Sequence, residues 1–172
     1  MGIDPKIEQP TRAMLGHAMR HELEDLASLV SATGDEVVAG AIGLCVFASG
    51  YVAIDVCEHW PTQADLQEIA KSASKSATKL DLDESDIYEY LSRVALGSEK
   101  LDDVFAMPKA GMLPLLITAN LLATFRPREK HWWEYLDQIW DAADTAARTS
   151  LTVLPALMLR ARKESTPRDD PA

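Results

Sequence analysis

The sequence contains only two cysteines, which argues against a fold held together by disulfides. Cys45 and Cys57 lie twelve residues apart in one predicted helix. They are therefore separated by ~18 Å along its axis, too far to bond to each other. The first ten residues, MGIDPKIEQP, lack the apolar core of a signal peptide. We therefore expect reduced thiols and a cytoplasmic location.

Positive charge and catalytic motifs are also scarce. The chain has 17 Lys and Arg against 27 Asp and Glu, a net charge of −10, so nucleic-acid phosphates would repel it. It has no glycine-rich phosphate loop, Gly-x-Ser-x-Gly, Cys-x-x-Cys or His-Glu-x-x-His motif. Residues 81–104 hold eight acidic and two basic residues, a local net charge of −6. This segment either binds a basic partner or, as is more usual, forms a solvated surface.

The longest uncharged run is VVAGAIGLCVFASGYVAI, residues 37–54. On a helix it shows no polar stripe, which is typical of a helix buried in a protein core or in lipid. Its length is the lower limit for crossing ~30 Å of hydrocarbon. Acidic residues flank it on both sides, without the Lys/Arg cluster that orients membrane helices. These features predict a core helix and no membrane span.

Small residues recur along one side of this helix. Gly43 and Gly50 belong to a seam with alternating spacings of four and three, whose other members are Ala39, Val46, Ala53 and Cys57. Each glycine inside a helix costs ~1 kcal/mol relative to alanine, so the seam suggests a closely approaching helix. That partner is either another helix of this chain, which we favour, or the same helix of a second copy.

The remaining sequence also predicts helices, and no segment shows the alternation of a strand. The fold class is therefore all-α: a single-domain bundle of six to eight helices around two apolar central helices, residues 36–58 and 112–125. We expect residues 1–10 to be a flexible lead-in, 11–163 one helical domain and 164–172 a disordered tail. The expected helices cover residues 11–32, 35–58, 62–80, 83–97, 99–106, 112–125, 128–149 and 155–163. Thr11 is expected to cap the first of these helices, and Thr62 with Asp65 three residues later approximates a capping box at the start of the third.

Asp55 and His59 are the first candidates for chemistry. They lie four residues apart at the end of the central helix, where a carboxylate can orient an imidazole for acid–base catalysis or metal binding. His131 is a possible further metal ligand if the helices converge. Asn120 interrupts the second apolar helix and either has structural partners or lines a pocket. For each of them, a structural role is the more common one, as it is for His17 and His21, which should face water on the first helix.

Three of the four tryptophans fall within residues 132–140. Trp132 belongs to the inner face of its helix. Trp133 and Trp140 lie seven residues apart at the edge of that face. They either pack at the edge of the core, which is the more common role, or wall a ligand cavity or form an interaction anchor. The helix's outer face carries Asp137 and Asp141, with Asp144 and Arg148 continuing it.

No motif in the sequence indicates a reaction or a cofactor. The leading hypothesis is a non-catalytic cytoplasmic binding module that self-associates as a dimer, with a small apolar ligand or a basic protein as a possible partner. One alternative is a metal-dependent or acid–base enzyme with a pocket near Asp55, His59, Asn120 and His131. Another is an acidic inhibitor or immunity-type partner of a basic protein.

Overall fold

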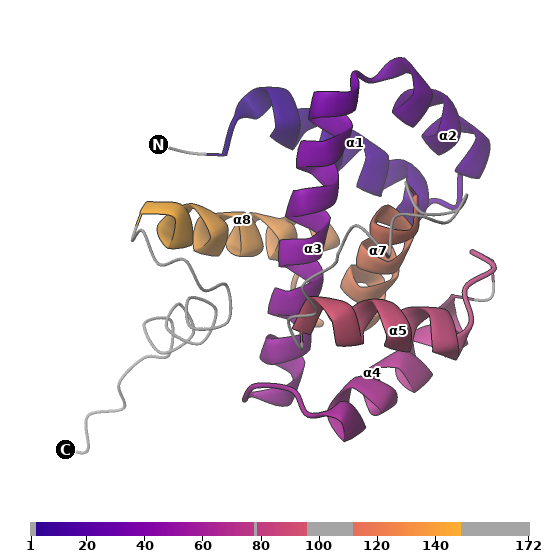
Figure 1. Cartoon of the computed structure of the whole chain (residues 1–172), viewed down its shortest axis with the longest axis vertical. Coiled ribbons are helices and arrows are strands. Elements are labelled where there is room, and N and C mark those ends of the chain that lie inside the picture. Colours follow the sequence, from indigo (N-terminus) through magenta and orange to yellow (C-terminus); the bar gives the residue numbers. More distant parts are fainter. Residues whose placement is uncertain (1–2, 78, 96–111, 149–172) are drawn as a thin grey trace.

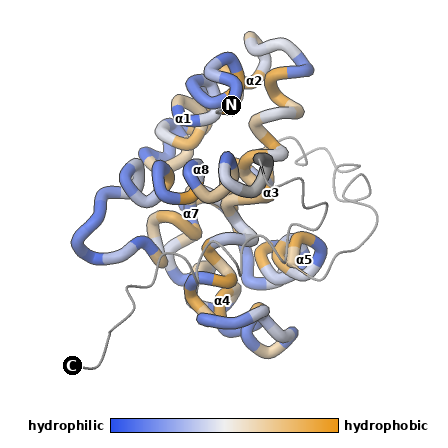
Figure 2. Tube along the Cα trace, turned by 90° about the vertical axis from the view of Figure 1, so that its left-hand side faces the viewer, coloured by the Kyte–Doolittle hydropathy of each residue, from blue (hydrophilic) through white to orange (hydrophobic). Residues whose placement is uncertain are grey.

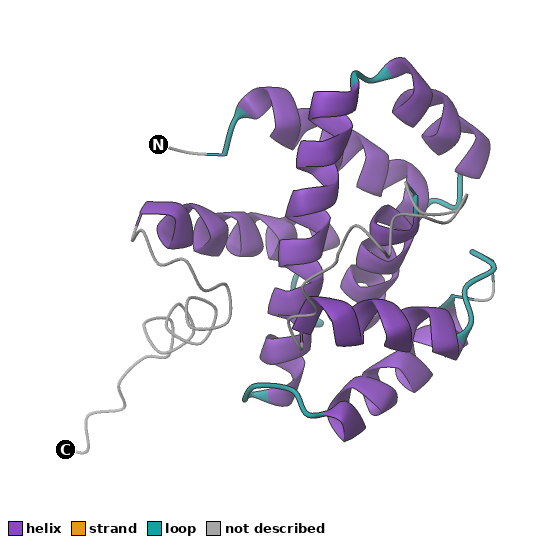
Figure 3. Cartoon of the chain, viewed as in Figure 1, coloured by secondary structure: helices purple, strands orange, loops and turns teal. Residues whose placement is uncertain are grey.

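The computed structural model describes residues 3–77, 79–95 and 112–148. Those residues form seven helices and no strand, which confirms the all-α fold class (Figure 3). The predicted helices at 99–106 and 155–163, the tail and part of the acidic 81–104 segment lie outside the described residues. The helices are α1 (Pro5–Met19), α2 (Leu23–Ala32), α3 (Asp35–Cys57), α4 (Gln63–Ser76), α5 (Glu84–Ala95), α7 (Leu113–Phe125) and α8 (Trp132–Arg148).

The beginning of the chain differs from the prediction, because α1 already starts at Pro5 rather than after a loose lead-in. The side chain of Asp4 caps it by accepting from the Lys6 N–H at 2.9 Å. The first turn of a helix tolerates proline, because the N–H that proline lacks would have no partner within the helix at that position. Thr11, expected as the cap, lies inside the helix, fully buried, and its hydroxyl donates to the Ile7 carbonyl.

The expected continuous helix 11–32 is also wrong, because the chain breaks between Met19 and Leu23. His21 adopts φ 59° in the left-handed region, a conformation that ends a helix. His17 and His21 therefore do not lie one turn apart on a shared helical face.

The two apolar helices do lie at the centre, as predicted. In Figure 1, α3 runs through the molecule, with α2 near its beginning and α4 and α5 near its end. α1, α5, α7 and α8 all contact α3, and α7 also contacts α1 and α4. By length and composition α3 is apolar enough to cross a membrane, yet 61% of its most apolar eighteen-residue window is buried within the protein.

Polar side chains inside the core join the central helices. The Ser49 hydroxyl of α3 lies 2.8 Å from that of Thr118 in α7 and 3.3 Å from that of Tyr90 in α5. Thr118 also donates to the Cys45 carbonyl at 3.1 Å. Burial raises the pKa of the Tyr90 phenol well above its ordinary value, so this network stays neutral.

The outer helices are amphipathic, as the mixed colours of α1, α4 and α8 in Figure 2 show. The predicted capping box at the start of α4 is present: Thr62 Oγ1 accepts from the Asp65 N–H, and Asp65 accepts from the Thr62 N–H. Two side-chain hydrogen bonds then fix α8 against α3, from Tyr135 to Asp55 and from Gln138 to Tyr51.

Candidate functional site

A cavity of about 420 Å³ lies where the start of the described chain and α1 meet α8. This volume is within the usual range of ligand pockets. The cavity combines four carboxylates, one guanidinium and two apolar side chains. Its lining consists of Ile3, Glu8, Arg12, Asp137, Trp140, Asp141 and Asp144.

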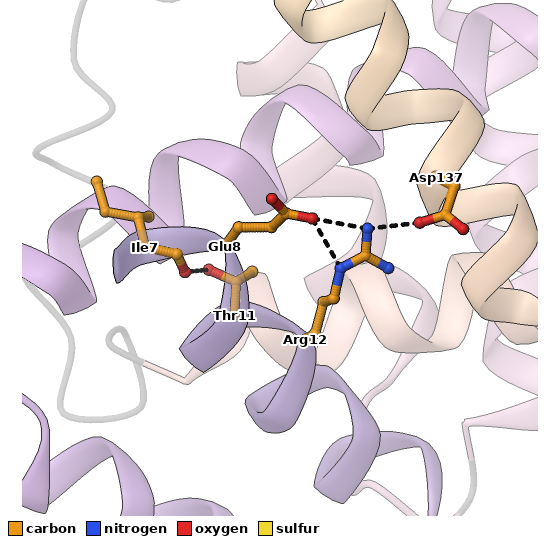
Figure 4. A network of polar contacts seen from close by, with 5 residues as sticks. All are labelled: Ile7, Glu8, Thr11, Arg12 and Asp137. Atoms are coloured by element: carbon orange, nitrogen blue, oxygen red, sulfur yellow. Dashed lines mark hydrogen bonds and ion pairs between the residues drawn. The ribbon is translucent and has the colours of Figure 1, made fainter. Parts of the chain in front are cut away.

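Arg12 holds the two sides of this cavity together (Figure 4). Its guanidinium donates through Nε at 3.0 Å and through a terminal nitrogen at 2.8 Å to Glu8 on α1. The same terminal nitrogen donates to Asp137 on α8, 125 residues away in sequence. Partial burial lowers the pKa of Arg12, but the hydrogen bonds and charges of the two carboxylates outweigh it and leave the pKa above its ordinary value. The cavity therefore contains a guanidinium held between two carboxylates.

Trp140 forms the aromatic wall of the cavity, and only 4% of its surface is exposed. Its indole nitrogen is buried and finds no acceptor in the part of the chain that the structure describes. A buried donor without a partner is unusual, because its lost hydration is not replaced. Trp140 was one of the two tryptophans that the sequence suggested as cavity walls or anchors.

Trp133, the other, lies elsewhere and is 45% exposed. Its ring stacks on His131 with centroids 4.3 Å apart and planes 7° apart. Trp132 meets it edge-on at 5.9 Å. The tryptophan pair suggested by the sequence is thus divided between a cavity wall and a surface cluster at the start of α8.

The structure gives each of the four residues of the enzyme hypothesis a different set of partners. Asp55 accepts a hydrogen bond from the Tyr135 hydroxyl. His59 is exposed and bonds the Trp60 carbonyl through Nδ1. Asn120 is buried between α7 and α4, donates to the Ala73 carbonyl and accepts from Ser76. His131 stacks on Trp133, so each of these four residues has contacts of its own.

The two seam glycines also differ in their surroundings. Gly50 is buried, whereas Gly43 is exposed and a Cβ added to it would meet no atom of the described part of the chain within 4 Å. A close helix contact is found at Gly40, where an added Cβ would lie 2.8 Å from two carbons of the Ile7 side chain on α1. Gly40 is outside the seam that the sequence pattern indicated.

Among the described residues, the group of three possible metal ligands is His17, Glu22 and Asp25 at the α1–α2 turn, so neither His59 nor His131 belongs to it. His17 Nδ1 lies 2.7 Å from Glu22, and Arg20 donates to the same carboxylate oxygen at 2.9 Å. The hydrogen bonds from Arg20 and His17 lower the pKa of Glu22. The Arg20 guanidinium already pairs with the Glu22 carboxylate. We therefore interpret the group as an ion-paired turn and not as a metal site.

The sequence reasoning missed Glu8, Arg12 and Ile3. Ile3 and Glu8 fell in the segment expected to be loose, and Arg12 was not considered for a site. The i,i+4 spacing of Glu8 and Arg12 is typical of an ion pair on a helix, and this spacing could have marked both residues.

Comparison with protein-family models, with curated proteins and with solved structures gives no match to this chain. Its function therefore has to be inferred from its own residues.

Proposed function

We propose that the protein is a cytoplasmic helical binding module that self-associates through the N-terminal half of α3. The observation that carries this proposal is the exposure of uncharged residues in a helix that is otherwise the core of the fold. Ala39 and Gly43 are exposed, and Val38 and Ile42 beside them are only half-buried. The stretch 37–54 of this helix carries no charge on any side, and such a stretch gains from being covered on every side.

The open side of α3 is shaped for another helix. A neighbouring side is already occupied, because Gly40, three residues before Gly43, packs closely against Ile7 of α1. On the open side Ala39 and Gly43 lie one turn apart and carry almost no side chain. Small residues at this spacing let two helix backbones approach closely, and a second copy of α3 supplies the same small surface about a two-fold axis.

The size of this surface limits the strength of the association. Residues 35–44 rise ~15 Å along the helix axis. An interface of this length is at the small end of those seen between proteins. We therefore expect a reversible, concentration-dependent dimer.

Sedimentation velocity over a range of protein concentrations tests the proposal. Gly43→Glu places a carboxylate at the centre of the seam, where two copies would repel each other, and its Cβ would meet no atom of the described residues within 4 Å. Gln67→Glu is the matched control, since it adds the same charge at an exposed position of α4.

The wild type and the control should dimerise, and Gly43→Glu should remain monomeric with an unchanged circular dichroism spectrum. A wild type that stays monomeric at every concentration would contradict the proposal. So would a Gly43→Glu variant that dimerises as well as the control.

A further inference from the structure

We infer that residues 154–163 of this chain fold back onto the open side of α3, where they exclude a second copy. These residues lie outside the described part of the structure. The consequence for self-association rests on the proposed function, because the segment and a second copy would use the same surface. The contact itself is a property of the monomer and can be tested there.

The open side of α3 is bordered by negative charge. Asp35 and Glu36 are exposed in the first turn of the helix, shortly before the exposed Ala39 and Gly43. Residues 21–70, which include α2 and α3, contain no lysine or arginine. An occupant of this side therefore meets acidic residues at the beginning of the helix and small, uncharged residues behind them. An amphipathic segment with a basic end has the matching chemistry.

Residues 154–163, LPALMLRARK, have this chemistry. They contain three basic residues and no acidic one, and all three bases fall within the last four positions. On a helix, which the sequence predicts for 155–163, four apolar residues share one side. These are Leu154, Leu157, Met158 and Ala161. An antiparallel arrangement with α3 brings the basic end of the segment to the acidic beginning of α3 and its apolar side to the small residues.

The direction of α8 leads the chain towards this half of α3. The Tyr135 hydroxyl bonds Asp55, whereas Gln138, three residues later, bonds Tyr51, about one turn earlier in α3. At their contact α8 therefore proceeds from the end of α3 towards its beginning. The residues that follow α8 continue from there.

The distance to be covered is short. Asp144 in the last turns of α8 lines the same cavity as Ile3, and in Figure 1 the end of α8 lies on the same side of α3 as the beginning of α1. Ile7 of α1 packs in turn against Gly40 of α3. Residues 148–154 span up to ~20 Å when extended, about twice the distance between the axes of two packed helices. The segment can therefore pass α1 and reach α3.

A segment of the same chain has an advantage over a second copy. A short connection gives it an effective concentration in the millimolar range, so that even a weak contact forms within one molecule. A second copy displaces the segment only when the protein itself is concentrated. The contact therefore sets the concentration at which the proposed dimer forms.

Thiol labelling in the monomer tests the contact. Ala39→Cys places a thiol on the open side of α3, and Ala64→Cys places one at an exposed position of α4. Labelling by iodoacetamide is followed by peptide mapping, at a protein concentration at which sedimentation velocity shows the monomer alone. Leu157→Glu adds a charge to the apolar side of the segment. Ala156→Glu is the matched control, because it adds the same charge to the opposite side.

Leu157→Glu should raise the labelling rate at position 39 about tenfold, because the burial of one leucine changes an equilibrium constant by at least about that factor. Ala156→Glu should leave this rate unchanged. The rate at position 64 should be the same in every variant. Equal labelling rates at position 39 in the Leu157→Glu and Ala156→Glu proteins would overturn the inference.

A synthetic peptide of residues 149–163 gives a second readout. Added at about 1 mM to the Leu157→Glu protein, it should restore slow labelling at position 39, whereas the same peptide carrying Leu157→Glu should not. The inference would also fail if both peptides slowed the labelling equally or if neither slowed it.

Sedimentation velocity over a range of concentrations separates this inference from the proposed function. The Leu157→Glu protein should dimerise at a lower concentration than the Ala156→Glu protein. Dimers that form equally in both variants would overturn the exclusion of a second copy. A chain that never dimerises would contradict the proposed function alone, and the labelling rates would still decide whether the segment covers α3.

Discussion

Gly40 and Gly43 should respond in opposite ways to alanine, although they lie three residues apart on the same helix. At Gly40, an added Cβ would lie 2.8 Å from both Cδ1 and Cγ2 of Ile7 and 3.1 Å from its Cγ1. Cβ atoms do not approach carbons that closely, so α1 or the Ile7 side chain must shift. At Gly43 the added methyl group meets nothing within 4 Å among residues 3–77, 79–95 and 112–148.

The size of the difference follows from two opposing effects. Alanine stabilises the interior of a helix by ~1 kcal/mol relative to glycine, and both variants gain this. Overpacking typically costs ~1–3 kcal/mol, and only Gly40→Ala incurs it. The free energy of unfolding should therefore be about 1–3 kcal/mol lower for Gly40→Ala than for Gly43→Ala. Gly43→Ala should exceed the wild type by up to ~1 kcal/mol.

Urea unfolding followed by circular dichroism measures both values, at a protein concentration low enough to keep the chain monomeric. Thermal midpoints should separate in the same order, by about 2–4 °C per kcal/mol for a chain of this size. Ile7→Ala supplies the control, because it removes all three contacting carbons. In that background Gly40→Ala should no longer destabilise the protein. Equal stability of the two single variants, or an unchanged cost of Gly40→Ala in the Ile7→Ala background, would refute the reasoning.

Two other predictions concern the core between α3 and α7. Thr118→Val keeps the side-chain shape but leaves the Cys45 carbonyl without its hydroxyl donor, and should lower the free energy of unfolding by about 1–3 kcal/mol. Adding Ser49→Ala should recover part of this loss in urea unfolding, and a further full loss would show that the hydroxyls are not coupled. Burial raises the pKa of the Cys45 thiol to about 12, so iodoacetamide at pH 8 should label the partly exposed Cys57 first and reach Cys45 only as the protein unfolds. Peptide mapping checks this order, and labelling of both thiols at equal rates would contradict it.

The candidate site could be predicted from the sequence only in pieces. Trp140 was marked by its place at the edge of an amphipathic face, and Asp137 and Asp141 by the outer face of the same helix. The ion pair that closes the cavity joins Arg12 and Asp137 across 125 residues, and no local pattern encodes that contact. The enzyme hypothesis relied on the same kind of distant convergence. In the structure His59 bonds the carbonyl of the neighbouring Trp60.

The sequence by itself determined the elements whose causes are local. A helix that is apolar on every side can be stable only where it is covered, so α3 and α7 were identifiable as the central pair. The Thr62–Asp65 capping box needs only residues three apart and was found in the expected place. The tertiary structure alone decided which side of α3 is covered. Only the packing of α1 makes Gly40 a required glycine and leaves Gly43 open, because both glycines look alike until a neighbouring helix approaches one of them.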